Sequence, residues 1–141
     1  MSKAARVKWA GDLTFVGESP SGHAVVMDGG AANGGRDHAI RPMEMLILGM
    51  GGCSSIDVVM ILKKARQKLV DCYVDIDSER ADEHPKVFKK IHAHFVLTGH
   101  DLDPAHVERA VKLSMEKYCS ASAQLGALAE ITWDYECHPA E

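Results

Sequence analysis

A long apolar segment, residues 43–62, restricts the fold of this chain more than any other feature. Pro42 suits the first position of a helix, and the helical pattern continues to about Lys68. The glycine-rich stretch 49–52 has poor helix propensity, so the sequence predicts a buried pair of helices interrupted there. The segment has almost no polar face, and a helix that is apolar all round must be buried on every side. One small domain offers limited material for this, so we expect a second subunit to cover it.

The length of this segment also suggests a membrane span. Glu44, Asp57 and three glycines lie within it, however, and would make insertion into a bilayer costly. The first eight residues carry charge but no apolar core segment, so we expect no signal peptide. Four cysteines are too few for a secreted disulfide scaffold, and a cytosolic disulfide is more often transient and catalytic than structural. The sequence therefore predicts a cytoplasmic protein without membrane contacts.

Length and charge restrict the function further. The 141 residues are enough for one ordinary domain, residues 1–141, that needs no metal or disulfide for stability. The formal net charge is −4, and the basic residues are spread along the chain rather than gathered on one face. Both features argue against a protein that binds nucleic acid.

Alternating and helical patterns place the remaining elements. Asp103 and Pro104 suit the N-cap and first residue of a helix that buries positions spaced three and four apart. The order strands, helices, strands, helix, strand indicates an α+β domain that begins with an antiparallel meander. The expected strands lie at residues 6–9, 13–16, 23–27, 72–77, 87–97 and 131–135, and the helix after Asp103 buries Val107, Ala110, Val111 and Ser114.

Cys53 and Cys119 are the leading candidates for chemistry. Cys53 follows the glycines and opens the second apolar helix, where unpaired N–H groups and the helix dipole favour a thiolate. Cys119 ends the later amphipathic helix. If the fold brings them together, the pair can cycle between dithiol and disulfide, although burial as small apolar residues explains them equally well. Asp57, one turn after Cys53, would raise the pKa of that thiol unless it is paired.

Other reactive residue types have simpler explanations. Cys72 and Cys137 alternate with apolar positions, which is typical of packing. His92 and His94 share one side of a strand without a nearby third ligand, so we expect an exposed polar face and no metal site. The glycine-rich loop 28–37 lacks Walker spacing, and we expect no cofactor.

Two segments together carry a family resemblance: RPMEMLILGMGGCSSIDVV at residues 41–59 and EKYCS at residues 116–120. They resemble the OsmC/Ohr family, most closely its YhfA-like branch, and the similarity extends over nearly the whole chain. The resemblance implies an OsmC-like intertwined homodimer in which antiparallel sheets wrap around central helices. It also implies active sites at the subunit interface.

The resemblance further implies that the protein reduces small organic hydroperoxides. Cys53 would attack the O–O bond and become a sulfenic acid, Cys119 would resolve it to a disulfide, and an external dithiol would restore both thiols. These peroxidases place a glutamate directly after the motif's proline, paired with an arginine. Here Met43 has that position, and Glu44 lies one residue later, about 100° around a helix.

The groups that would activate Cys53 are therefore candidates by position alone. Glu44 precedes Cys53 by nine residues, which puts the two on opposite faces of an uninterrupted helix. They can meet only if residues 49–52 bend or if Glu44 comes from the partner subunit. Arg36 and Arg41 are candidates for the arginine by proximity.

The sequence thus predicts a cytoplasmic, dimeric thiol peroxidase. A non-enzymatic, stress-associated or hydrophobic-ligand-binding OsmC-like protein is the alternative. A dimer whose cysteines merely pack is the third possibility.

Overall fold

The computed structural model describes residues 4–141, which form two compact units, Met1–Leu46 and Ile47–Glu141. Residues 1–3, part of the segment expected to lack a signal peptide, lie outside the described residues. The prediction that residues 1–141 form one domain stays a prediction.

The first unit holds the expected meander. Strands β1 (Arg6–Trp9), β2 (Phe15–Glu18) and β3 (Ala24–Met27) pair antiparallel in chain order. β2 begins two residues later than predicted because a turn extends to Thr14, whose backbone N–H donates to the carbonyl of Gly11 at 2.8 Å, with φ of 100° at Gly11 and 45° at Asp12. Left-handed backbone of this kind cannot continue a strand.

One buried carboxylate organises the loop after β3, which contains the short helix η1 (Ala31–Asn33). Asp28 accepts hydrogen bonds from the backbone N–H groups of Gly29, His38 and Arg36, at 2.7, 3.2 and 3.3 Å. Burial alone would raise the pKa of Asp28, but these bonds stabilise its charged form, and the pKa is lowered. The glycine-rich loop is thus held by its own backbone donors.

Helix α1 (Pro42–Lys64) begins at the predicted proline and is continuous over 23 residues, so the predicted interruption near residues 49–52 is wrong. Each glycine costs about 1 kcal/mol of helix propensity, a cost that packing can offset. At Gly51 the missing side chain brings the helix close to the next strand. A Cβ there would lie 3.0 Å from Cδ1 of Ile76 and 3.4 Å from Cγ1 of Val74.

The C-terminus of α1 also differs from the expectation of a helix to about Lys68. Arg66 has a left-handed φ of 58°, and the N–H of Gln67 donates to the carbonyl of Leu62 at 2.9 Å. This is the hydrogen-bond pattern of a helix C-cap. Lys68 is therefore the first residue of the following strand.

The second unit is built on one sheet with the order β4 (Lys68–Arg80), β5 (Phe88–His100), β6 (Glu130–Pro139). The turn at residues 81–87 joins β4 and β5 antiparallel, but β6 pairs with β5 in parallel, where the sequence predicts only antiparallel sheets. The reason is the connection, since parallel neighbours need a long crossover. It consists of α2 (Pro104–Leu113), a π-helix η2 (Ser114–Tyr118) and α3 (Ser120–Gly126), of which α3 was not predicted.

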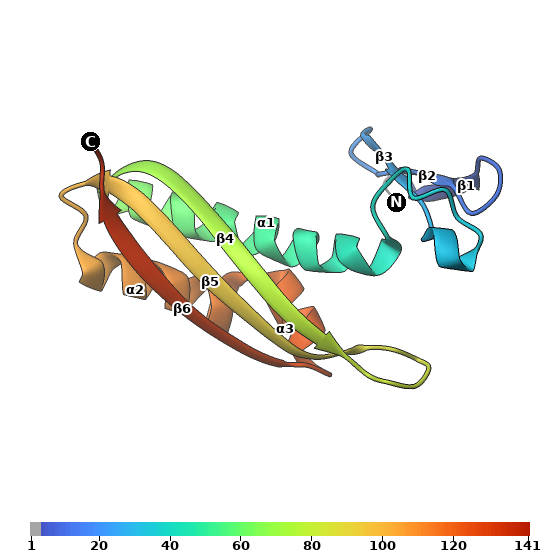
Figure 1. Ribbon diagram of the computed structural model, residues 1–141. Helices are drawn as coiled ribbons and strands as arrows, with labels where there is room; N and C mark the ends of the chain where they lie inside the picture. The colour runs from blue at the N-terminus through green and yellow to red at the C-terminus, as the bar shows by residue number, and fades with distance from the viewer. Residues whose placement is uncertain (1–3) are drawn as a thin grey trace. The chain divides into compact units, whose positions relative to one another are not determined.

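The core of this unit lies between the sheet and the helices, which cover one face of it (Figure 1). Asp103 caps α2 through the N–H of Ala105 at 2.9 Å, as predicted. The predicted alternation along β5 and spacing along α2 are confirmed, and the α+β fold class with them. The fully buried apolar residues include Met50, Val58 and Leu62 of α1, Ile91, Ala93, Phe95 and Leu97 of β5, and Val107, Ala110 and Val111 of α2.

Helix α1 is only partly covered within one chain. Leu48 and Ile56 are each 62% exposed, and Val59 and Met60 are exposed as well. Length and composition alone would let α1 cross a membrane. That is weak evidence, because core helices share these properties, and Asp57 on α1 accepts a hydrogen bond from Ser114 within the unit.

Candidate active site

Cys53 lies in the interior of α1, not at a helix start as the sequence predicts. The reason is the continuity of α1 through the glycines. Free N–H groups and the positive end of the dipole occur in the first turn of a helix, so neither acts on Cys53. Its side chain is half-buried.

Cys119 follows the π-helix η2 and begins α3, so its predicted place at the end of a helix is confirmed. Its backbone N–H donates to the carbonyl of Ser114 at 2.7 Å. Its sulfur accepts a hydrogen bond from the N–H of Ser122 at 3.3 Å. Cys119 is only 3% exposed.

The structure brings the two thiols close to each other, because the Cys53 thiol is among the groups that raise the pKa of Cys119. The Cys119 sulfur also lies 4.0 Å from the carbonyl oxygen of Met50. Burial raises the pKa of the Cys119 thiol most, hydrogen bonds from Ser122 lower it, and the contact with Cys53 raises it again. A buried thiol and a more accessible one thus lie close together.

A buried serine network, which the sequence reasoning missed, surrounds this pair. Ser114 donates from its hydroxyl to the carbonyl of Ser54 at 2.9 Å and to the Asp57 carboxylate at 3.2 Å. Ser54 donates to the carbonyls of Met50 and Gly51 of its own helix, at 2.9 and 3.2 Å. The available signal was a serine on each buried helix face, because a buried hydroxyl needs a partner. Asp57 thus has a hydrogen-bond partner but forms no ion pair with any residue that the structure describes.

The other three predicted site residues lie in the first unit. Glu44 accepts a hydrogen bond from the backbone N–H of Arg41 at 2.8 Å, which is half of a capping box at the start of α1. The guanidinium of Arg41 donates to Asp37 at 2.7 Å, and this carboxylate raises the pKa of Arg41. Arg36 pairs with Asp12. Within residues 47–141, no arginine forms a hydrogen bond with Cys53.

Cys72 and Cys137 flank Leu97 in the register of the second sheet. Both are half-buried, and burial raises the pKa of each thiol. This placement agrees with the predicted packing role.

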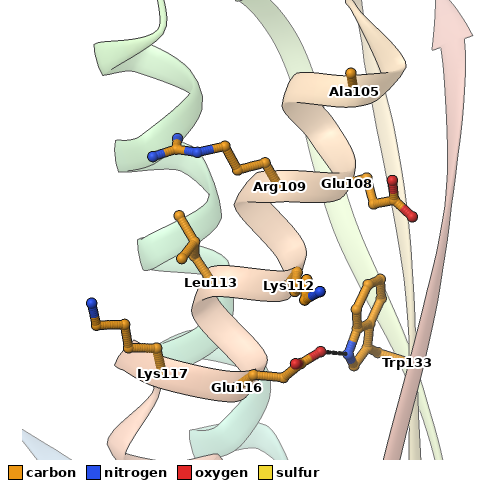
Figure 2. Close-up of a pocket in the computed structure, with 8 residues that line it drawn as sticks. All are labelled: Ala105, Glu108, Arg109, Lys112, Leu113, Glu116, Lys117 and Trp133. Atoms are coloured by element: carbon orange, nitrogen blue, oxygen red, sulfur yellow. Dashed lines mark hydrogen bonds between the residues drawn. The ribbon is translucent and has the colours of Figure 1, made fainter.

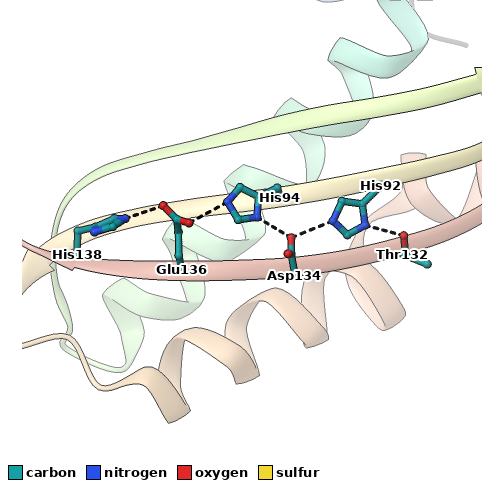
Figure 3. A network of polar contacts seen from close by, with 6 residues as sticks. All are labelled: His92, His94, Thr132, Asp134, Glu136 and His138. Carbon is teal, nitrogen blue, oxygen red and sulfur yellow. Dashed lines mark hydrogen bonds and ion pairs between the residues drawn. The ribbon is translucent and has the colours of Figure 1, made fainter.

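His92 and His94 belong to a chain of polar contacts on the other side of β5 and β6 (Figure 3). Asp134 bonds His94 at 2.6 Å and His92 at 2.9 Å, and Glu136 bonds His138 and His94 at 2.6 and 3.2 Å. Asp134 raises the pKa of His94, and the histidines lower the pKa values of Asp134 and Glu136. Among residues 4–141, no group of three or more metal-ligating side chains is arranged to hold a metal.

Neither thiol lines either of two surface hollows. The first, of about 670 Å³, is lined by charged residues of α2 and η2 and by Trp133, whose indole N–H donates to Glu116 at 3.1 Å (Figure 2). The second, of about 630 Å³, lies in the first unit. Its lining is mostly apolar and includes Leu13, Phe15 and Met27, with Arg41 as a charged member.

Comparison with known proteins gives a consistent family assignment. The model of the OsmC-like protein family matches residues 34–134. Protein YhfA of Escherichia coli K12 is 54% identical over 132 residues, which cover 94% of this chain and 96% of YhfA. A hypothetical protein from Aquifex aeolicus VF5 has a crystal structure that is 30% identical, with a TM-score of 0.79 and 96% of each chain covered.

An organic hydroperoxide resistance protein OsmC from Legionella pneumophila has the same fold. Its TM-score is 0.69, and 98% of each chain is covered. The two sequences are 17% identical, so this likeness concerns the fold alone.

Proposed function

The chain belongs to the OsmC-like protein family, and from this premise we propose that it is a cysteine-based thiol peroxidase that reduces organic hydroperoxides. The observation that carries the proposal is the proximity of the half-buried Cys53 to the buried Cys119, whose pKa it raises. A disulfide can form only between two cysteines whose sulfur atoms lie close together.

Cys53 is the attacking residue because its sulfur is the more accessible. Its thiolate attacks the terminal oxygen of the hydroperoxide, the O–O bond breaks, and the peroxide leaves as an alcohol once its alkoxide is protonated. Sulfur 53 is oxidised to a sulfenic acid. The Cys119 sulfur then attacks sulfur 53, the S–O bond breaks, water leaves, and a disulfide forms.

An external dithiol reverses the oxidation in two exchanges. We place its first attack on sulfur 53, because Cys119 is 3% exposed. The departing Cys119 thiolate accepts the N–H of Ser122, which stabilises its charge. A second attack by the dithiol releases Cys53 and leaves the reductant as a disulfide.

A second copy of this chain is the partner that we propose for the exposed face of α1. We define the α1 apolar face as Leu48, Ile56, Val59 and Met60, all of which are exposed. Exposed large apolar side chains gathered on one helix are typical of an interaction site. A homodimer would bury this face, as the sequence predicts.

The same dimer offers a source for the activating groups. Because α1 is uninterrupted, nine residues of helix put Glu44 and Cys53 of one chain on opposite faces. We therefore propose that Glu44, Arg41 and Arg36 reach Cys53 from the partner subunit. The four free cysteines favour a cytoplasmic location.

Dithiol-dependent loss of an alkyl hydroperoxide tests the proposal. Reduced wild-type protein should consume tert-butyl hydroperoxide in the presence of dihydrolipoamide, and Cys53→Ser should stop this consumption. Cys72→Ser serves as the matched control and should retain the wild-type rate. Equal rates in the wild type and Cys53→Ser would refute the proposal.

A specific observation favours binding of a hydrophobic ligand as the second candidate function. The apolar hollow of the first unit has about 630 Å³, a volume typical of small-molecule sites, with Arg41 as a charged lining residue. Native mass spectrometry of freshly purified protein would show a co-purified ligand. A clean apo mass together with robust peroxide turnover would exclude this alternative.

A further inference from the structure

Ser114 is hydrogen-bonded to the backbone of Cys119 and to the backbone of Ser54, the neighbour of Cys53, and this inference rests on the redox chemistry proposed above. Its hydroxyl donates to the carbonyl of Ser54, the residue next to Cys53, at 2.9 Å. Its own carbonyl accepts the backbone N–H of Cys119 at 2.7 Å. One fully buried residue therefore connects the backbone beside each sulfur.

The π-helix makes this double connection possible. In an α-helix a carbonyl accepts from the residue four positions later, whereas the carbonyl of Ser114 accepts from Cys119, five positions later. The wider turn ends at Cys119, and α3 begins with its thiol as the cap. π-turns of this kind are frequent at functional sites.

The hydroxyl is the part of Ser114 that joins two separate elements. α1 carries Cys53, and the α2–η2 segment leads to Cys119, so a shift of one past the other would separate the sulfurs. The Ser114–Ser54 bond opposes that shift. Asp57, one turn further along α1, accepts from the same hydroxyl at 3.2 Å and holds it against the same helix.

We propose that Ser114 is a positioning residue whose hydroxyl holds α1 against η2 and thereby sets the effective concentration of the Cys53 thiol toward the Cys119 thiol. It touches neither the peroxide nor the reacting atoms. Its effect falls on the equilibrium in which the protein dithiol and an external disulfide become the protein disulfide and an external dithiol. Each exchange breaks one S–S bond and forms one, so electrons and protons balance.

The test measures this equilibrium in dithiothreitol redox buffers, with the Cys53–Cys119 disulfide quantified by intact mass and peptide mapping. Ser114→Ala should lower the equilibrium constant for the disulfide about tenfold, the weight of one buried hydrogen bond. Ser54→Ala is the matched control, because it removes an equally buried hydroxyl that bonds only carbonyls of its own helix. The equilibrium constant for the disulfide in Ser54→Ala should stay within about twofold of the wild-type value.

A second pair of variants separates the hydroxyl from packing and serves if Ser114→Ala does not fold. Ser114→Thr keeps the hydroxyl. Ser114→Val has the shape of the threonine variant but lacks the hydroxyl. The Thr variant should form the disulfide about tenfold more favourably than the Val variant. Equal values for the two, or equal shifts in Ser114→Ala and Ser54→Ala, would overturn the positioning role and leave the peroxidase proposal intact. A wild-type protein that forms no disulfide in any buffer would overturn both.

Discussion

Gly51 of α1 and Ile76 of β4 are so close that a Cβ on the glycine would lie 3.0 Å from Cδ1 of the isoleucine. This contact sets how tightly the helix that carries Cys53 packs on the sheet. Ile76→Val deletes that one carbon atom. We expect Gly51→Ala to be more favourable in the Ile76→Val background by about 0.5–1 kcal/mol, because the clash then disappears.

A double-mutant cycle in urea checks the Gly51–Ile76 contact. Gly126→Ala is the control for helix propensity, since a Cβ there lies 3.4 Å from Cδ1 of Ile131, not Ile76. Its effect should be the same with and without Ile76→Val. Additive effects of Gly51→Ala and Ile76→Val would show that the helix is not held this closely.

The α1 apolar face predicts the oligomeric state. Ile56 of this face is 62% exposed, and a glutamate there would place a charge in the proposed interface. Ile56→Glu should therefore reduce the mass measured by sedimentation equilibrium by about half. Leu128→Glu makes the same chemical change on a residue that is 75% exposed outside α1 and should leave the dimer intact. A monomeric wild type would contradict the interface.

The histidine–carboxylate chain of β5 and β6 predicts how stability depends on pH. The raised pKa of His94 contributes stability below the ordinary imidazole value of 6.5, which is lost as the pH rises through the raised value. The lowered pKa values of Asp134 and Glu136 contribute above 3.8 and 4.5, and this is lost as the pH falls. The network is therefore most stabilising between about pH 5 and pH 6.

Urea unfolding at about pH 5.5 and about pH 8 checks this dependence. His94→Gln should reduce the stability lost between the two, because it removes the group whose protonation is coupled to folding. His100→Gln, at the end of β5 and outside the network, should keep the wild-type difference. An unchanged difference in His94→Gln would assign the pH dependence to other groups.

The unequal exposure of the two sulfurs predicts the route of reduction. In Cys119→Ser, Cys53 should form a stable mixed disulfide with an added activated thiol, because no second sulfur displaces it. In Cys53→Ser, Cys119 should form this adduct at least about tenfold more slowly, since it is buried with a raised pKa. Time-resolved mass spectrometry gives both rates. Comparable rates of adduct formation in the two variants would contradict this prediction, because the reductant could then attack either sulfur.

Local patterns predicted much of the fold. Alternation located β1 and the buried face of β5, and Asp103–Pro104 located the start of α2, because burial and capping act on neighbouring residues. The continuity of α1 could not be predicted, since glycine propensity opposes it and the close approach at Gly51 depends on packing against Ile76 and Val74 of another element. The parallel β6 was also missed, because its direction depends on a crossover whose last helix, α3, is seven residues long.

The sequence predicted the reactive residues of the site but not the residues that hold them in place. Cys53 and Cys119 were identified, and the structure places them close enough for Cys53 to raise the pKa of Cys119. The helix-dipole argument for Cys53 failed together with the predicted break in α1. Ser114 was expected only as a buried position, because its hydrogen bonds join segments sixty residues apart, and such pairs leave no local pattern.

The most direct test of the central claim is the fate of the thiols after one equivalent of an organic hydroperoxide. Reduced wild-type protein should lose two hydrogens in its intact mass, and peptide mapping should find Cys53 linked to Cys119. Cys119→Ser should instead gain oxygen on Cys53. Protein that stays reduced, or that becomes oxidised only at Cys72 or Cys137, would contradict the account.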